Sequence, residues 1–278
     1  MMDKAAITGA DAILLDLEDA VPEDEKGLAR NIARAYISRV NSHPVFVRVN
    51  AFASKQMLND LEAVVSPGLC GVFLPKVNSP EEVRTVSDWL DSLEVELGVG
   101  PRTVELICML ESANGVRLGY EIGTSSSRVV ALLFASGENG DFQTDVGCDW
   151  SIDGTEMLYA RSKVVLDARS AGLEYVLDGV YVDIDNVEGL VADTTLSKRL
   201  GYTGRTIIHP KHVDHVNRAY TPTDVEFEYY SALLAAFEAA LAGGRASVSF
   251  RGKMIDYAMA TRARRVLARK EMFTPTAP

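Results

Sequence analysis

The chain has 278 residues and is acidic: 39 Asp and Glu against 28 Lys and Arg give a formal net charge of −11 at pH 7. This charge argues against nucleic acid as a partner, although a local arginine or metal can still attract an anionic substrate. The hydrophobic fraction of 47% and the charged fraction of 24% are ordinary for a soluble globular protein. The length suffices for one large barrel domain or two smaller domains.

Nothing in the sequence predicts a membrane or secreted protein. Its apolar runs are too short to span a bilayer, and the start, Met1-Met2-Asp3-Lys4, has no signal-peptide core. The three cysteines are odd in number and lack CxxC spacing, which is typical of reduced cytosolic thiols. We therefore expect a cytoplasmic protein without a membrane partner.

The chain alternates between short apolar runs and helical stretches. The runs predict buried strands at residues 12–17, 44–50, 71–75, 106–111, 129–135, 179–182 and 206–209. The stretches predict helices that include 25–40, 58–65, 80–90, 115–122 and 157–171. Such alternation indicates a parallel sheet, and strand spacings of roughly 25–45 residues suit a TIM-type (β/α)₈ barrel.

The first strand of this barrel is expected to be missing. Only seven strands are predicted, and residues 1–10 resemble the tail of a helix that leads into the first of them. A barrel without one strand has two unpaired edges. Either the native chain starts upstream of Met1 or another segment covers the gap.

The predicted barrel domain comprises residues 1–222, and residues 223–278 form a C-terminal extension. The extension reads as an alanine-rich helix over 224–243, a strand-like alternation at 246–250 and a basic helix over 257–270. Because the barrel plan does not need it, we expect this extension to pack on a neighbouring subunit.

Glu111 ends the apolar run of the fourth predicted strand, and small residues follow it from Ser112 to Gly115. A carboxylate at the carboxyl end of a buried strand needs compensation, most commonly by a metal ion. Active sites of barrel enzymes are built at this end of the strands. The alternative is a solvated glutamate that merely starts a loop.

The following strand favours the metal site. It ends in the segment Ser136 to Asp141, so two successive strands deliver Glu111 and either Asp141 or Glu138 to the same rim. Because Cys and His are absent near both ends, the ligand set is all oxygen. Such a set suits Mg²⁺ or Mn²⁺ rather than Zn²⁺.

Three further carboxylates, Asp16, Glu18 and Asp19, follow the first predicted strand. Strand alternation places Asp16 and Glu18 on one face, and we favour a functional role for at least one of the three. The alternative is that Asp19 or Asp24 caps the next helix.

Arg48 lies inside a predicted strand between valines. A buried guanidinium requires an anion, and its fork matches a substrate carboxylate. The alternative is an internal ion pair with Asp16 or Glu18. Lys76 is a weaker candidate of the same type.

His209, His212 and His215 are spaced by three residues, with Pro210 expected to start a helix. A catalytic zinc usually needs a third ligand in a fixed triangle, and the nearest acid is Asp214. Packing or cofactor contact is therefore favoured over zinc. Serine-hydrolase and nucleotide-fold motifs are absent.

Several motifs occur together in a characteristic order: 14–21, 47–50, 74–77, 110–112, 141–147, 159–162, 178–183, 208–210 and 252–256. In this order the chain resembles the citrate lyase β-subunit-like family. That family belongs with the malyl-CoA and citramalyl-CoA lyases and, more distantly, with the HpcH/HpaI aldolases.

The chain departs from the family in two places. It lacks the opening Arg-Ser-x-Leu-Phe-Val-Pro strand, and the short Gly-x-Glu-Asp segment is longer here, over 136–141. Asp141 matches the family acid best, because Phe142, Asp145 and Gly147 follow it.

The resemblance implies Mg²⁺ held by Glu111 and Asp141, with Glu18 and Asp19 holding its water ligands. It also implies that Arg48 binds the oxo-acid oxygen or the carboxylate of the substrate. Asp256 would be the catalytic acid–base group and would reach the active site of an adjacent subunit, although its position before a helix also suits an N-cap.

Lys26 and Arg30 are weaker candidates for contacts with coenzyme A phosphates; on their own they look like any solvated helix face.

The implied enzyme is a carbon–carbon (oxo-acid) lyase. It would cleave a 3-hydroxy-3-carboxyacyl-CoA, such as malyl-, citramalyl- or citryl-CoA, into an acyl-CoA and a 2-oxo acid. One alternative is a citrate lyase β subunit that acts on an acyl-carrier-protein thioester within a complex. Another is a non-catalytic barrel that serves as a binding or assembly partner. Shared sites would imply a homo-oligomer, a trimer or hexamer.

Overall fold

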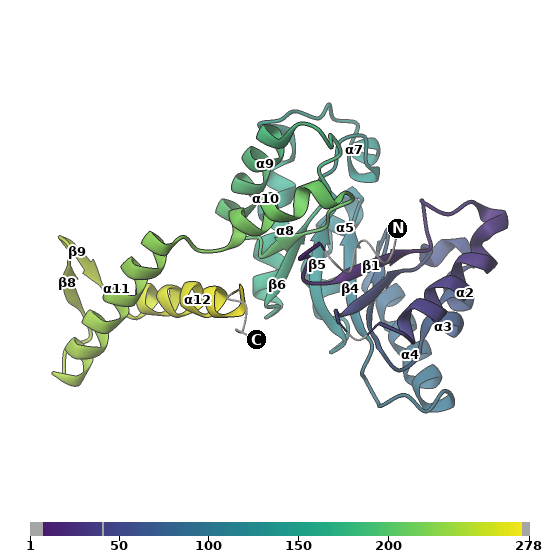
Figure 1. The fold of residues 1–278 in the computed structure, drawn as a ribbon, viewed down its shortest axis with the longest axis horizontal. Helices are drawn as coiled ribbons and strands as arrows, with labels where there is room; N and C mark the ends of the chain where they lie inside the picture. The colour runs from purple at the N-terminus through teal and green to yellow at the C-terminus, as the bar shows by residue number, and fades with distance from the viewer. Residues whose placement is uncertain (1–7, 41, 274–278) are drawn as a thin grey trace. The chain divides into compact units, whose positions relative to one another are not determined.

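The computed structural model describes residues 8–40 and 42–273 (Figure 1). The chain divides into two compact units, residues 1–216 and 217–278, so the division falls before the predicted boundary at 222. The predicted helix tail within residues 1–10 falls largely on positions 1–7, outside the described residues.

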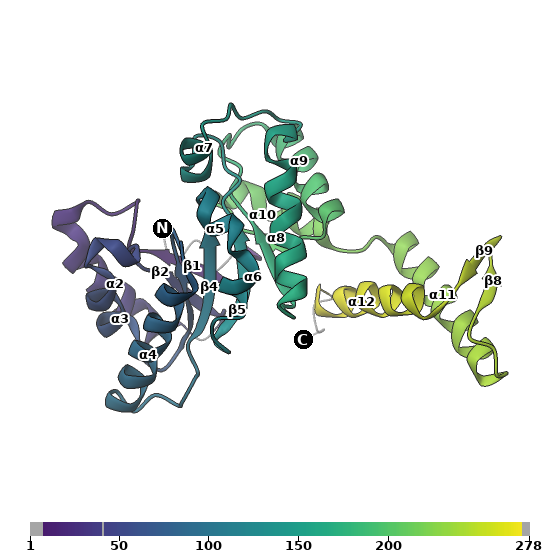
Figure 2. The same cartoon turned by 180° about the vertical axis from the view of Figure 1, so that it is seen from behind.

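The first unit is built on one parallel sheet, which within the described residues has seven strands in sequential order. The strands are β1 (Ile13–Asp16), β2 (Val45–Arg48), β3 (Leu69–Leu74), β4 (Glu105–Leu110), β5 (Val129–Phe134), β6 (Tyr175–Asp178) and β7 (Gly204–Arg205). The sheet curls into a half-barrel with helices around it (Figures 1 and 2). The predicted TIM-barrel type of fold is confirmed.

Helices connect successive strands, and one more follows the last strand of the sheet, β7. They are α2 (Lys26–Ile37), α3 (Met57–Val64), α4 (Pro80–Glu96), α5 (Ala113–Arg117), α6 (Gly119–Gly123), α7 (Asp141–Val146), α8 (Leu158–Ser170), α9 (Val187–Leu200) and α10 (Val213–Tyr220). Short 3₁₀ helices lie at η1 (Glu23–Glu25), η2 (Phe52–Ser54), η3 (Thr155–Met157) and η4 (Pro210–His212). Serine caps start two of these helices: Ser79 accepts from the Glu82 amide before α4, and Ser112 accepts from the Gly115 amide before α5.

The central strands are buried on both faces, which explains their unbroken apolar runs. In β4, Leu106, Cys108 and Leu110 are completely buried, and Ile107 and Met109 on the opposite face are less than a tenth exposed. Ile107 and Met109 belong to a core cluster whose other buried members are Phe73, Ala131 and Leu133.

The predicted strands at 179–182 and 206–209 were wrong, because β6 and β7 end before them. The Gly179 carbonyl is satisfied by the Arg205 side chain instead of a strand ladder, with Nε at 3.0 Å and Nη2 at 2.8 Å. The chain after β6 also lies against Ser136, so close that a Cβ on Gly179 would be 2.5 Å from the Ser136 nitrogen.

The sheet has two open edges within the described residues, since β1 pairs only with β2 and β7 only with β6. In the same part of the chain, no helix is both long enough and apolar enough to cross a membrane.

The second unit is a helical pair with a hairpin between its helices. Its elements are α11 (Asp224–Ala242), the antiparallel strands β8 (Val248–Phe250) and β9 (Lys253–Ile255), and α12 (Tyr257–Phe273). A capping box between Thr223 and Glu226 starts α11. The core of this unit comprises Leu233, Phe237, Ile255, Ala260 and Ala263. The packing of this unit on a neighbouring subunit stays a prediction.

A buried ion pair secures α4 to the chain just before β5. Arg128 Nη2 lies 2.6 Å from Glu94 Oε2, and each side chain is 1% exposed. Glu94 also accepts hydrogen bonds from the amides of Arg102, Thr103 and Val104. Burial alone would raise the pKa of Glu94, but the hydrogen bonds from Arg128 and these amides lower it from 4.5 to about 2.

We expect Glu94→Gln to destabilise the protein at neutral pH by on the order of 3 kcal/mol, since it leaves the buried Arg128 with Asp91, which is 44% exposed, in place of its buried charge partner. Below pH 4.5 the unfolded chain takes up this proton before the folded chain does, so the wild-type advantage should shrink as the pH falls from 4.5 to about 2. Urea unfolding of both proteins across this range measures the difference. A constant difference would contradict a lowered pKa.

Candidate active site

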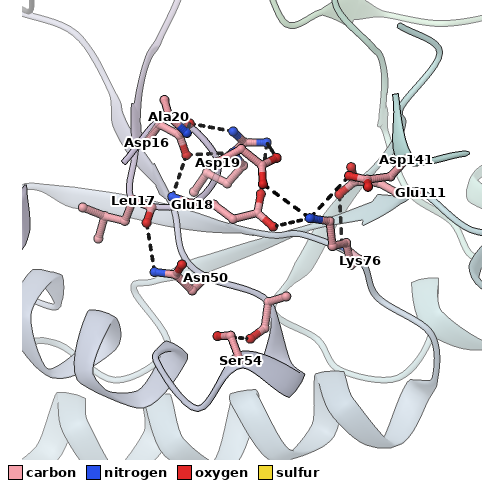
Figure 3. Close-up of polar contacts among 12 residues, drawn as sticks. Asp16, Leu17, Glu18, Asp19, Ala20, Asn50, Ser54, Lys76, Glu111 and Asp141 are labelled. Atoms are coloured by element: carbon pink, nitrogen blue, oxygen red, sulfur yellow. Dashed lines mark hydrogen bonds and ion pairs between the residues drawn. The ribbon is translucent and has the colours of Figure 1, made fainter. Parts of the chain in front are cut away.

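Charged side chains meet at the carboxyl ends of β1 to β5 (Figure 3). We define them as the carboxylate cluster, which consists of Asp16, Glu18, Asp19, Glu111 and Asp141 together with the bases Arg48 and Lys76. The strands are parallel and adjacent, so each of them delivers its end to the same rim.

Arg48, the last residue of β2, binds Asp16 with its guanidinium fork. Nε lies 2.8 Å from Asp16 Oδ1 and Nη2 lies 2.6 Å from Oδ2. The remaining nitrogen, Nη1, lies 3.1 Å from Glu18 Oε2 and 3.5 Å from Asp19 Oδ2. The internal ion pair that the sequence left open is therefore present, and substrate binding by Arg48 stays a prediction.

Lys76 holds the cluster together from the end of β3. Its ammonium lies 3.0 Å from Glu18 Oε1 and 3.4 Å from both Asp19 Oδ1 and Asp141 Oδ2. Its backbone amide donates to Glu111 Oε1 at 3.0 Å. The residue has a φ of 53°, a left-handed conformation that is uncommon for a side chain of this size.

Glu111 is the most deeply placed acid of the site. It is 5% exposed. Burial raises its pKa to about 7; the carboxylates of Glu18 and Asp141 act in the same direction, against the Lys76 amide and Arg48. Glu111 therefore changes its charge near neutral pH in the protein without a metal ion.

The donor set of the cluster fits a hard divalent cation. The cluster has five carboxylates and only two basic side chains, and every acidic side chain offers oxygen atoms to a cation. Glu18 Oε2 is buried and, among the described residues, receives no hydrogen bond despite its proximity to Arg48. In the same part of the chain no three acidic, His or Cys side chains are already gathered as a metal site, and the Lys76 ammonium lies among Glu18, Asp19 and Asp141.

The structure distinguishes between the two acids of the loop after β5. Asp141 begins α7 and points toward Lys76 beside Glu111 (Figure 3). Glu138 is exposed and lines a separate small pocket with residues that include Trp150 and Tyr181. The cluster therefore contains Asp141 and not Glu138, while its identity as a metal ligand stays a prediction.

Comparison with known proteins agrees with this architecture. A sequence profile of the HpcH/HpaI aldolase/citrate lyase family matches residues 1–210. The chain belongs to this family. A profile of carbon–carbon bond lyases of the TIM-barrel fold matches residues 156–274. The resemblance seen in the motifs is confirmed, and the protein is a carbon–carbon lyase by family.

Members of the HpcH/HpaI aldolase/citrate lyase family resemble the chain over nearly its whole length. The β subunit of citrate lyase from Escherichia coli K12 is 34% identical over 278 residues, which cover 98% of this chain and 89% of that protein. The mitochondrial citramalyl-CoA lyase of Mus musculus is 31% identical over 272 residues, covering 92% and 78%. CitE from Mycobacterium tuberculosis, solved with magnesium, acetoacetate and coenzyme A, has a TM-score of 0.75 at 28% identity and covers 97% and 92%.

In this member of the HpcH/HpaI aldolase/citrate lyase family, the two basic residues predicted to contact coenzyme A face the protein interior. Lys26 is 8% exposed, and its ammonium donates to the carbonyls of Leu17 and Glu18, both at 2.9 Å. Arg30 Nε lies 2.7 Å from Asp60 Oδ1. These contacts support the chain at the end of β1; binding of coenzyme A by either residue stays a prediction.

Sequence reasoning missed Asn50 and Asp60. The Asn50 side-chain amide donates to the Leu17 carbonyl at 2.9 Å and to Asp60 Oδ2 at 2.7 Å, and Asp60 is completely buried. The available signal was the position of Asp60 on the apolar face of α3, between Met57 and Val64. A carboxylate there needs buried partners.

Two further candidates make local structural contacts. His212 is buried, its Nε2 is 3.2 Å from the Ile184 carbonyl, and its ring packs near Tyr181, which agrees with packing instead of zinc.

Asp256, in the second unit, accepts hydrogen bonds at Oδ1 from the amides of Ala258 and Met259 at 3.0 and 3.2 Å. It therefore caps α12, and its acid–base role stays a prediction.

Glu111→Gln should reveal the raised pKa in protein kept free of metal by a chelator. Between pH 4.5 and about 7 the unfolded chain loses the Glu111 proton before the folded chain does, so wild-type stability falls as the pH rises. The variant has no such proton. Relative to wild type, its free energy of unfolding should rise by about 3 kcal/mol between about pH 4 and about pH 8. Urea unfolding at both pH values checks this, and an unchanged difference would contradict it.

Proposed function

We propose that the protein is a Mg²⁺-dependent lyase that cleaves, or forms, a 3-hydroxy-3-carboxyacyl-CoA, with an acyl-CoA and a 2-oxo acid as the other pair of reactants. The observation that carries the proposal is the oxygen-only carboxylate cluster beside Arg48 at the carboxyl rim of the sheet. Similarity to citramalyl-CoA lyase, and to a structure that contains magnesium, acetoacetate and coenzyme A, supports it.

Glu111 and Asp141 would hold Mg²⁺, or Mn²⁺ in its place, and Glu18 and Asp19 would hold its water ligands. When bound, the ion would supply Lewis-acid polarisation of the substrate oxygen. Glu18 and Glu111 are buried, so solvent screens their charges weakly and their attraction for a cation is stronger than it would be in water.

Arg48 and Lys76 would orient the oxo acid. Nε and Nη2 of Arg48 are both occupied by Asp16. The third nitrogen, Nη1, lies near Glu18 and Asp19 and is the one that would turn to a substrate. A substrate carboxylate or hydroxyl oxygen would bind at this edge. Lys76, whose side chain is 35% exposed, adds a second positive charge on the solvent side.

Cleavage requires one proton to be moved. A base takes the proton of the C3 hydroxyl, the C2–C3 bond breaks, and its electron pair forms the enolate of the thioester while C3 becomes the oxo carbon. The same proton is then returned to C2, so atoms and charge balance. Asp256 is our candidate for this group: it is exposed, and both of its capping hydrogen bonds go to Oδ1.

The second unit would carry Asp256 to the active site of another copy of the chain. This requires a homo-oligomer with shared sites, which we propose to be a trimer or hexamer in the cytoplasm. The exposed side chains on either side of Asp256, Met254 at 72% and Tyr257 at 55%, support an intersubunit surface here.

The direct test of function uses purified protein, Mg²⁺ and separate malyl-, citramalyl- and citryl-CoA, with release of the oxo acid measured. Turnover of one of them without any carrier protein is expected. Turnover only of a carrier-protein thioester would instead support the role of the citrate lyase β subunit, to which the chain is 34% identical in Escherichia coli. Inactivity on both thioester types would support a non-catalytic barrel.

Metal binding should depend on Glu111 and Asp141. Glu111→Gln or Asp141→Asn should abolish Mg²⁺ binding and activity without loss of the folded state, because each removes a charged oxygen ligand. Calorimetric titration with Mg²⁺ and circular dichroism measure both properties. Glu138→Gln is the matched control. If it abolishes binding while Asp141→Asn does not, Glu138 is the ligand; if none has an effect, the metal site is refuted.

Arg48→Lys should weaken binding of the oxo acid by roughly ten- to a hundredfold, because lysine keeps the charge but loses the planar fork. The KM for the oxo acid in the condensation direction measures this effect. Asp16→Asn is the control, since it removes the internal partner and keeps the guanidinium. A lower melting temperature for Arg48→Lys with an unchanged KM would show that the ion pair is only structural.

Asp256 should act between subunits. Asp256→Ala and Glu111→Gln oligomers should each be inactive, whereas mixed and reassembled oligomers should recover activity, because some sites then receive an intact residue from each chain. Loss of the cap at Asp256 costs only about 1 kcal/mol, so folding should survive. Absence of recovery in oligomers shown by mass to be mixed would place Asp256 in its own subunit's site.

A further inference from the structure

The loop between β5 and α7 is long and must nevertheless deliver Asp141 to the carboxylate cluster. β5 ends at Phe134 and α7 starts at Asp141. The middle of the loop is a tight turn in which the Gly140 amide donates to the Gly137 carbonyl at 3.1 Å and Asn139 has a φ of 58°. Such a turn fixes the loop internally but does not attach it to the barrel.

Ser136 attaches this loop to the end of β6. Its hydroxyl donates to Asp178 Oδ1 at 2.7 Å, and the two residues are 5% and 0% exposed. The loop after β5 and the chain after β6 are in close contact. A Cβ on Gly137 would lie 3.1 Å from Val180 Cγ2, and one on Gly179 would lie 2.5 Å from the Ser136 nitrogen. Two glycines thus allow the approach, and the hydroxyl makes the polar link.

Asp178 is a fixed acceptor because buried arginines hold it. Arg161 pairs with Asp178 and also with Asp193, the latter at 2.9 Å. Arg205 lies 2.8 Å from Asp193 Oδ2. Burial pushes the pKa of Asp178 upward, but Arg161 and Arg205 hold it below its ordinary value, so Asp178 stays ionised and accepts a charge-assisted hydrogen bond from Ser136.

We propose that Ser136 is a positioning residue, whose hydroxyl anchors the loop on Asp178 so that Asp141 is held at the metal site. The inference rests on the proposed function, which makes Asp141 a metal ligand. Without the anchor the loop samples more conformations, and metal binding must order the loop again. The loss therefore appears in metal affinity and not only in stability.

Ser197 provides a matched control. It is completely buried on α9 and also makes a side-chain hydrogen bond to Asp178. α9 carries none of the residues of the carboxylate cluster. Ser136→Ala and Ser197→Ala each remove one hydroxyl that hydrogen-bonds to the Asp178 carboxylate. Only Ser136→Ala releases the segment that leads to Asp141.

The experiment is calorimetric titration of the full chain with Mg²⁺ alone, together with melting temperatures in chelator, for wild type, Ser136→Ala, Ser197→Ala and Asp141→Asn. Ser136→Ala is expected to weaken Mg²⁺ binding by about three- to tenfold, the range of one hydrogen bond, while Ser197→Ala lowers the melting temperature and keeps wild-type affinity. If Ser136→Ala does not fold, Ser136→Cys, which has nearly the same shape and a weak donor, is measured by the same criteria.

Wild-type Mg²⁺ affinity in Ser136→Ala, with binding lost in Asp141→Asn, would overturn the positioning role and leave the proposed function standing. Equal weakening by Ser136→Ala and Ser197→Ala would likewise overturn it, since the effect would then come from the shared ion network. Unchanged binding in Asp141→Asn would overturn both the inference and the metal-ligand assignment from which it follows.

Discussion

The concentration of negative charge at one rim of the sheet is the constraint on which the rest of the site depends. Glu18 and Glu111 are buried there, and Asp19 and Asp141 face the same ammonium of Lys76. Carboxylates in such surroundings are poorly solvated and also repel one another, which raises the pKa of Glu111 to about 7. Arg48 and Lys76 offset part of this charge, and a divalent cation at the same point would offset more of it.

The surrounding fold holds these charges in place with buried polar contacts. At the end of β1, Lys26 and Asn50 both donate to the Leu17 carbonyl, and Asp60 holds Asn50. On the other side of the half-barrel, Ser136 links the Asp141 loop to Asp178. Both sides of the site are thus supported in the same way: a buried ion or amide restrains the backbone next to a residue of the carboxylate cluster. Such restraint keeps like charges together that would otherwise separate.

Sequence reasoning found the parts of the fold that depend on local pattern. β3 to β5 are apolar because the sheet is covered on both faces there, and the ends of β4 and β5 brought Glu111 and Asp141 together as parallel strands require. β6 and β7 were misplaced because a side chain, that of Arg205, satisfies the Gly179 carbonyl where a strand partner was expected. Lys26 looked like part of a solvated helix face because its acceptors, the carbonyls of Leu17 and Glu18, come from another segment. Contacts of this kind are fixed by tertiary packing and leave no periodic signal.

The central claim is that the carboxylate cluster binds a divalent cation through Glu111 and Asp141. The most direct measurement is anomalous diffraction from crystals of the full chain soaked with Mn²⁺, which takes the same oxygen ligands as Mg²⁺ and scatters strongly. The account predicts an anomalous peak coordinated by the Glu111 and Asp141 carboxylates, with the Lys76 ammonium moved away from Asp141. A peak bound by other residues, or none at this rim in crystals with Mn²⁺ in excess, would contradict it.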